Sequence, residues 1–96
     1  MPVVRIHRYR VAPDSLDALL AQRATVIDGI RRGHPGLTET RLVRQEDGSY
    51  LDTWRWESAE QMLAALAAAQ GFPLVGATMA LTEDDTAETG EIIDER

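Results

Sequence analysis

A chain of 96 residues with 44% hydrophobic and 27% charged residues is typical of one small globular domain. It has no cysteine, which excludes disulfides and thiolate metal sites, and it has no lysine, which excludes Schiff-base chemistry. The formal charge of −6 arises in the acidic C-terminal segment 83–96, because residues 1–82 carry nine acids and nine arginines. Phosphate binding needs clustered positive charge, so we expect a single domain over residues 1–96 with no nucleic-acid partner.

Nothing in the sequence is typical of a membrane or secreted protein. The longest apolar run, Met62 to Ala69, is far shorter than the roughly 20 residues that a membrane-spanning helix needs. The first apolar run carries charges, unlike a signal peptide. We therefore expect a cytoplasmic protein that does not bind membranes.

The first third of the chain predicts a strand followed by a helix. Residues 3–11 are rich in β-forming residues and alternate in part, which predicts a strand. Asp14 or Ser15 can cap the helix that follows, because either side-chain oxygen can accept from first-turn N–H groups. Glycine and proline within 33–36 end that helix. Its apolar residues recur at helical spacing: Leu16, Leu19, Leu20, Val26, Ile27 and Ile30.

The middle of the chain predicts a hairpin and a second helix. Residues 37–45 and 49–57 are strands, joined by a turn at Asp47-Gly48, where glycine allows a positive φ. Ser58 with a glutamine three residues later reads as a capping box that opens a helix over about 59–70. The third strand places four polar or aromatic side chains on one face: Tyr50, Asp52, Trp54 and Trp56.

The last part of the chain predicts a short helix over 74–82 and a final strand within 86–94, with Ile92 and Ile93 as its apolar residues. The resulting order, β-α-β-β-α-(α)-β, predicts an α+β, ferredoxin-like fold with a four-stranded antiparallel sheet and helices on one face. The other face would be bare and would expose aromatic residues as a large apolar patch. Such a patch usually indicates a partner or a ligand.

Three segments together resemble a known family. They are a strand ending in residues 9–14, a helix ending in His34-Pro35-Gly36, and the hairpin 47–58, which ends in Trp56-Glu57-Ser58. Over nearly the whole chain this pattern is similar to the antibiotic biosynthesis monooxygenase-like proteins of the dimeric α/β-barrel superfamily. The resemblance implies a homodimer in which two sheets face each other across a two-fold axis and form a barrel. It also implies a pocket between sheet and helices in each subunit.

The resemblance further implies a choice of activities. Some members oxidise phenolic or anthrone-like compounds with molecular oxygen and no metal or flavin, using asparagine, tryptophan, tyrosine and arginine. Others degrade haem with asparagine, tryptophan and a histidine on a late helix. This chain has no asparagine, and its only histidines are His7 and His34, so haem chemistry is not expected. No metal-ligand spacing or glycine-rich phosphate loop is present, so we expect no metal and no cofactor.

Three residues are the candidates for catalysis. His7 could hydrogen-bond a substrate oxygen or act as a general base near neutral pH. Tyr9, on the same strand face, could donate to a ligand carbonyl, and Trp54 could stack on a flat ligand and donate one hydrogen bond. Each also has an ordinary structural interpretation, namely a hydrogen-bonded histidine, a packed tyrosine and a core or interface tryptophan.

Five further residues are the candidates for substrate binding. Trp56 could stack on the ligand or fill the core. Arg41 could stabilise an enolate, or it could pair with Asp52 across the hairpin, an interaction worth about 0.2–1 kcal/mol. Phe72 and Met79 could close the far wall of a pocket.

These candidates support three hypotheses about function. The first is cofactor-independent oxygenation of a small phenolic or anthrone-like molecule, with His7 or a carboxylate as the base. The second is a non-catalytic dimeric module for small-ligand binding or housekeeping, which the lack of asparagine favours. The third is an isomerase or cyclase on a polyketide-like substrate, which would use the same base without oxygen.

Overall fold

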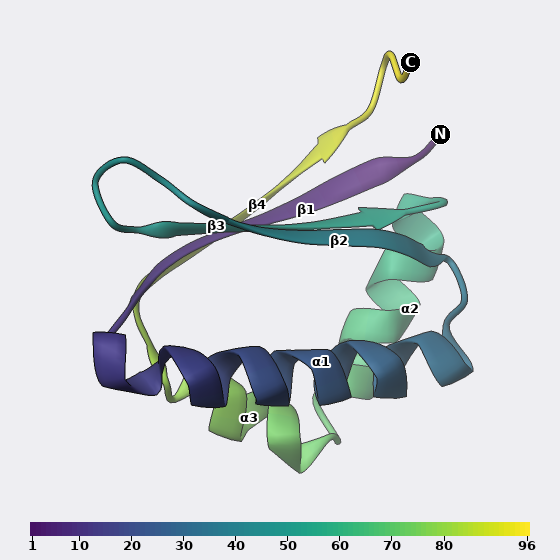
Figure 1. The fold of residues 1–96 in the computed structure, drawn as a ribbon. Coiled ribbons are helices and arrows are strands. Elements are labelled where there is room, and N and C mark those ends of the chain that lie inside the picture. The colour runs from purple at the N-terminus through teal and green to yellow at the C-terminus, as the bar shows by residue number, and fades with distance from the viewer.

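The computed structural model describes residues 1–96 and contains a four-stranded antiparallel sheet with all its helices on one side (Figure 1). The strands lie in the order β2-β3-β1-β4, so β1 and β3 are central. This arrangement confirms the predicted α+β, ferredoxin-like fold. In chain order the elements are β1 (Val3–Val11), a 3-10 helix (Pro13–Ser15), α1 (Leu16–Gly33), β2 (Leu37–Arg44), β3 (Tyr50–Trp56), α2 (Ala59–Ala69), α3 (Pro73–Met79) and β4 (Thr82–Glu91).

The start of α1 differs from the prediction. Ser15 occupies the N-cap position, but neither its side chain nor that of Asp14 caps the helix. The 3-10 turn runs directly into α1, and the Ser15 N–H donates to the Ala12 carbonyl at 2.8 Å. Ser15 therefore has helical dihedral angles (φ −99°, ψ −6°) rather than the extended ones that direct a capping side chain toward the first turn.

The hairpin turn and the start of α2 are as predicted. Gly48 has a φ of +86°, a conformation that costs glycine little and other residues more. Asp47 supports the turn, since its carboxylate accepts from the Ser49 N–H at 2.9 Å. Ser58 is the N-cap of α2, and its hydroxyl oxygen accepts from the Gln61 N–H at 3.1 Å.

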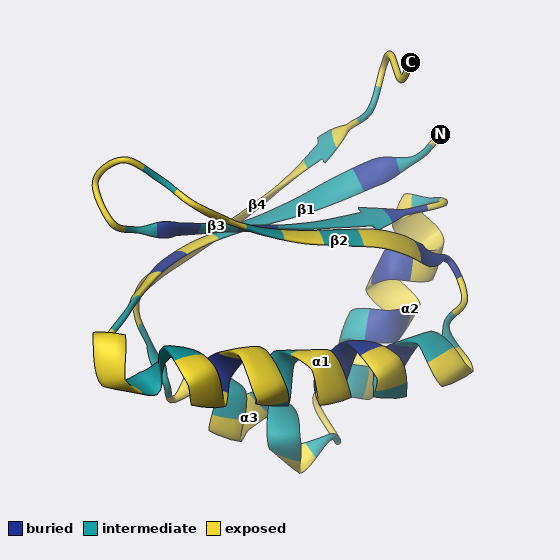
Figure 2. Ribbon diagram, in the orientation of Figure 1, coloured by how far each residue is buried: buried dark blue, intermediate teal, exposed yellow.

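β4 begins earlier and ends earlier than predicted. It spans Thr82–Glu91 along the edge of the sheet beside β1, so Ile92 and Ile93 lie beyond the strand. Backbone pairing with β1, interrupted by an irregularity near a positive-φ residue, Asp84, sets its extent. Its residues are mostly exposed (Figure 2). An edge strand that faces solvent tolerates acidic residues. The positions of apolar residues in the sequence therefore did not indicate where this strand begins and ends.

The register decides which side chains face the helices. Val3 pairs with Trp56 and Tyr9 with Tyr50, and all four side chains are buried on the helix-covered face. The prediction that the bare face exposes aromatic residues is therefore wrong. That face instead carries aliphatic side chains beside charged ones: Val4, Ile6, Val43 and Leu51, with Arg8, Glu39, Arg41, Arg55 and Glu88.

The core between sheet and helices has two parts. The larger surrounds Trp56 where β3 meets α1 and α2, and the smaller joins Tyr9, Leu19 and Tyr50. Figure 2 shows these buried positions on the helices and on the central strands.

None of the helices combines the length and the apolar character that a membrane span requires. α2 and α3 reach that length only together, and they are bent by 93° relative to each other.

Candidate functional site

Two neighbouring hollows adjoin the helix-covered face of the sheet. The inner one, of about 70 Å³, lies between β1, β3, α1 and α3, and the outer one, of about 250 Å³, is bordered by residues of β1 and β4 and by Met79. His7, Tyr9 and Met79 border both. Of the predicted site residues, the inner hollow gathers five: His7, Tyr9, Asp52, Trp54 and Met79.

Asp52 is the centre of a buried hydrogen-bond network. Asp52 as a whole is only 5% exposed, and its carboxylate accepts from the Tyr9 hydroxyl at 2.7 Å and from the Trp54 indole N–H at 2.8 Å. The Arg23 guanidinium donates to the same carboxylate through Nε at 3.1 Å and Nη2 at 2.9 Å. A buried carboxylate needs such partners, because unpaired burial of a charge is costly.

This network holds Tyr9 and Trp54 in place. Burial, and then the charge and hydrogen bond of Asp52, raise the pKa of the Tyr9 hydroxyl well above its usual range, so Tyr9 stays protonated. Its proton and that of the Trp54 indole are both directed at Asp52. Neither group has a free N–H or O–H for a ligand in this arrangement, but Trp54 itself borders the inner hollow.

Arg23 was not among the predicted site residues. Its side chain is 15% exposed, its Nη1 makes no hydrogen bond within the chain, and Arg23 borders the inner hollow. The sequence nevertheless contained a pattern that points to Arg23. Arg23 lies four residues after Leu19 and three before Val26, on the apolar stripe of α1, where an arginine is normally paired or functional.

His7 differs from its neighbours because it has no hydrogen-bond partner within the chain. Burial, and then the positive charge of Arg5, lower the pKa of its imidazole below 6.5, and Asp52 and Asp85 oppose this shift. The imidazole is therefore mostly neutral at pH 7 and can accept a proton. No three carboxylate or imidazole side chains lie where they could hold a metal ion.

Three predicted site residues lie outside these hollows. Trp56 is fully buried in the core, and its indole N–H has no partner. Phe72 packs against Gly29 beside a separate hollow. Arg41 points to the bare face and pairs with Glu39 at 2.9 Å, so the predicted Arg41–Asp52 pair does not form. The physical reason is register, which places the two side chains on opposite faces of the sheet.

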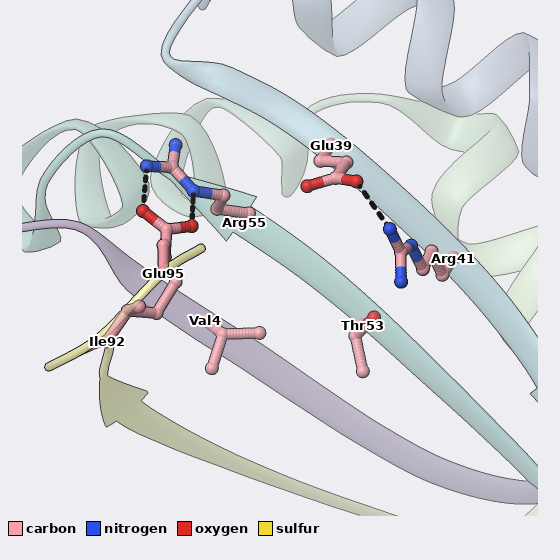
Figure 3. Close-up of a pocket in the computed structure, with 7 residues that line it drawn as sticks. All are labelled: Val4, Glu39, Arg41, Thr53, Arg55, Ile92 and Glu95. Atoms are coloured by element: carbon pink, nitrogen blue, oxygen red, sulfur yellow. Dashed lines mark hydrogen bonds and ion pairs between the residues drawn. The ribbon is translucent and has the colours of Figure 1, made fainter.

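The bare face has a shallow pocket of about 190 Å³ of its own (Figure 3). There the Arg55 guanidinium donates two side-on hydrogen bonds to the Glu95 carboxylate, from Nε at 2.6 Å and from Nη2 at 2.8 Å. This contact ties the C-terminal residues to the sheet, and Ile92 and Val4 also line the pocket. Most residues that line this pocket are charged and paired with one another. The pocket is therefore less suited than the inner hollow to binding a small apolar ligand.

Comparison with known proteins gives the same family as the sequence pattern. The family model described as antibiotic biosynthesis monooxygenase matches residues 2–70. No curated protein is similar enough in sequence to count as a relative. Among solved structures, SnoaB, a cofactor-independent oxygenase from Streptomyces nogalater, is 23% identical with a TM-score of 0.75. The alignment covers 98% of this chain and 95% of that one.

Two further solved structures share the fold. Rv0793 from Mycobacterium tuberculosis is 26% identical, with a TM-score of 0.66 and coverage of 99% of this chain and 98% of that one. A protein from Deinococcus radiodurans described as a putative antibiotic biosynthesis monooxygenase is 15% identical, with a TM-score of 0.76 and coverage of 98% and 95%. Because the family model covers residues 2–70 of the 96, the chain belongs to the antibiotic biosynthesis monooxygenase family.

Proposed function

We propose that this protein is a cofactor-independent monooxygenase that acts on a small phenolic or anthrone-like substrate. The observation that carries the proposal is that a neutral, unpartnered His7 and Trp54 border the same hollow between sheet and helices. Family membership and the fold shared with SnoaB, described as a cofactor-independent oxygenase, also support it.

The first step would be removal of a proton from the substrate by His7. A phenol or anthrone has an acidic proton because its anion is delocalised over the aromatic rings. His7 is the better base of the two candidates, since its ring has no partner, whereas the Asp52 carboxylate already accepts from three side chains. Arg23 would stabilise the resulting oxyanion through the Nη1 N–H groups that Asp52 does not use.

The second step would be reaction of the substrate carbanion with molecular oxygen. One electron passes to oxygen, and recombination of the radicals with a proton forms a carbon hydroperoxide. Loss of water then breaks the O–O bond and leaves a carbonyl. Overall, a methylene group and dioxygen give a ketone and water, so one oxygen atom enters the product and no external reductant is needed.

The buried network would act as a rigid frame for this chemistry. Trp54 would stack on the flat substrate, and Asp52 would fix the angle of the indole through the N–H bond at 2.8 Å. Met79, which borders both hollows, would cover the outer part of the substrate. These roles depend on one carboxylate, so loss of Asp52 would disturb both the frame and Arg23.

We also propose that the protein is a homodimer that pairs through the bare face of the sheet. The family resemblance implies this arrangement, and aliphatic side chains on that face support it. Val43 is 45% exposed, and Ile6 and Leu51 are half-buried in the single chain. A second copy placed face to face would cover them.

A non-catalytic binding module is the second candidate. It is favoured by the closed network, in which the Tyr9 and Trp54 protons are already bonded to Asp52 rather than directed at a ligand. Such a module would bind the same aromatic molecules without consuming oxygen.

Oxygen uptake by metal-stripped protein with anthrones and hydroquinone-like phenols tests the proposal. We expect uptake that depends on the protein, and a fall of about 100-fold or more in kcat/KM for His7→Ala, as for other general bases. Trp54→Ala should also slow turnover. His34→Ala is the matched control, because His34 borders neither the inner nor the outer hollow.

The pH dependence gives a second readout. His7 must be neutral to accept a proton, so kcat/KM should fall as the pH drops through the lowered pKa of His7, below 6.5. Full activity in His7→Ala and Trp54→Ala would refute the assignment. Binding without uptake would favour the non-catalytic module, and turnover without oxygen would indicate an isomerase or cyclase.

A further inference from the structure

Arg5 is an arginine of β1 that faces the helices and has no carboxylate partner. Its Nε–H is buried and has no acceptor within the chain. Its only side-chain hydrogen bond runs from Nη1 to the Thr89 hydroxyl at 3.2 Å. A buried donor without an acceptor is costly, so its presence calls for an explanation.

The unpartnered part of Arg5 belongs to the edge that arginines use to bind carboxylates. Nε and Nη2 of a guanidinium form a fork that matches the two oxygens of a carboxylate. Arg23 uses this edge to bind Asp52, and Arg55 uses it to bind Glu95. In Arg5 neither atom of this edge has a protein partner, but Nε is closed to solvent, so Nη2 is the atom through which a ligand carboxylate would bind.

The position of Arg5 links this edge to the proposed substrate space. Arg5 borders the outer hollow of about 250 Å³, together with His7, Tyr9 and Met79, which also border the inner one. β1 places it two residues from His7 on the same face, opposite Trp54 on β3. A molecule that stacks on Trp54 and reaches the outer hollow would meet Arg5.

We propose that Arg5 binds a carboxylate of the substrate, which makes the substrate class an aromatic acid rather than a neutral phenol. This inference rests on the proposed function, because it concerns the same pair of hollows. Asp85 also borders the outer hollow but makes no ion pair with Arg5, so a ligand carboxylate would not have to displace a protein carboxylate.

The test compares two probes of the same shape by isothermal titration calorimetry. 2-Naphthoate carries a carboxylate, and 2-naphthamide is its neutral counterpart. We expect the unmodified protein to bind 2-naphthoate about ten-fold tighter or more, as a charge-assisted pair would give. Arg5→Gln should remove this preference. Arg8→Gln is the matched control, because Arg8 lies on the same strand with its side chain on the bare face.

Each outcome bears on the proposal. Loss of the preference in Arg5→Gln but not in Arg8→Gln supports it. Equal affinity for the two probes, no binding of either, or a preference that persists in Arg5→Gln overturns it. The probe comparison in the unmodified protein does not depend on whether a variant folds.

The two proposals fail separately. Arg5-dependent binding of 2-naphthoate without oxygen uptake from any aromatic acid would leave the carboxylate site and remove the oxygenase. Oxygen uptake with a neutral anthrone, in a protein that shows no preference for 2-naphthoate, would leave the oxygenase and remove the carboxylate site.

Discussion

At the scale of single residues, the site is organised by a buried charge pair. Asp52 and Arg23 come from β3 and α1, and their side chains are 6% and 15% exposed. The attraction between the two charges mainly offsets the free-energy cost of removing each of them from water. The same carboxylate orients Tyr9 and Trp54, so stability and site geometry depend on one side chain.

Removal of the Asp52 carboxylate should therefore destabilise the folded protein strongly. We expect Asp52→Ala to lower the free energy of unfolding by about 3 kcal/mol, because Arg23 would stay buried without a counter-ion. Urea denaturation measures this. Glu39→Ala is the control, since it breaks an exposed pair with Arg41 and should change stability by less than about 0.5 kcal/mol. Equal effects of the two substitutions would show that the buried pair has no special role.

At the scale of elements, the two long helices begin in different ways although both have serine at the N-cap. The Ser58 side chain accepts from the first turn of α2, whereas the Ser15 side chain makes no such bond in α1. The sequence predicted caps at both. The difference arises because Pro13 starts a 3-10 turn that continues into α1 and leaves no extended residue at its start.

The two serines form a matched pair for mutation. We expect Ser58→Ala to lower the free energy of unfolding by about 1 kcal/mol, the usual value of an N-cap side chain. Ser15→Ala should have almost no effect. Thermal or urea denaturation of the two variants side by side checks this, and a larger loss in Ser15→Ala would contradict the description of α1.

At the scale of the whole molecule, one layer of helices covers one face of the sheet and leaves the other face uncovered (Figure 1). The uncovered face mixes aliphatic side chains with paired charges, including the Arg55–Glu95 contact that holds the C-terminal residues. Such a mixture differs from the aromatic patch that the sequence predicted. It is compatible with pairing of two copies by both apolar burial and charge.

Sedimentation equilibrium tests the proposed homodimer. We expect a dimer at micromolar concentration, and we expect Ile6→Glu to shift it toward monomer, because it would bury a charge at the centre of the bare face. Leu63→Glu is the control, since Leu63 is exposed on α2, away from the sheet. A stable unmodified monomer would contradict the barrel arrangement.

The sequence alone determined the elements and their order, because helical and strand periodicity, the Gly48 turn and the Ser58 cap are local signals. It also brought His7, Tyr9, Asp52, Trp54 and Met79 into consideration as site residues. Tertiary structure decided what those side chains contact. Strand register is set by pairing between distant segments, and a shift of one residue reverses the faces of a strand. For that reason only the structure could separate Arg41 from Asp52, bury Trp56 in the core and bring Arg23 to the site.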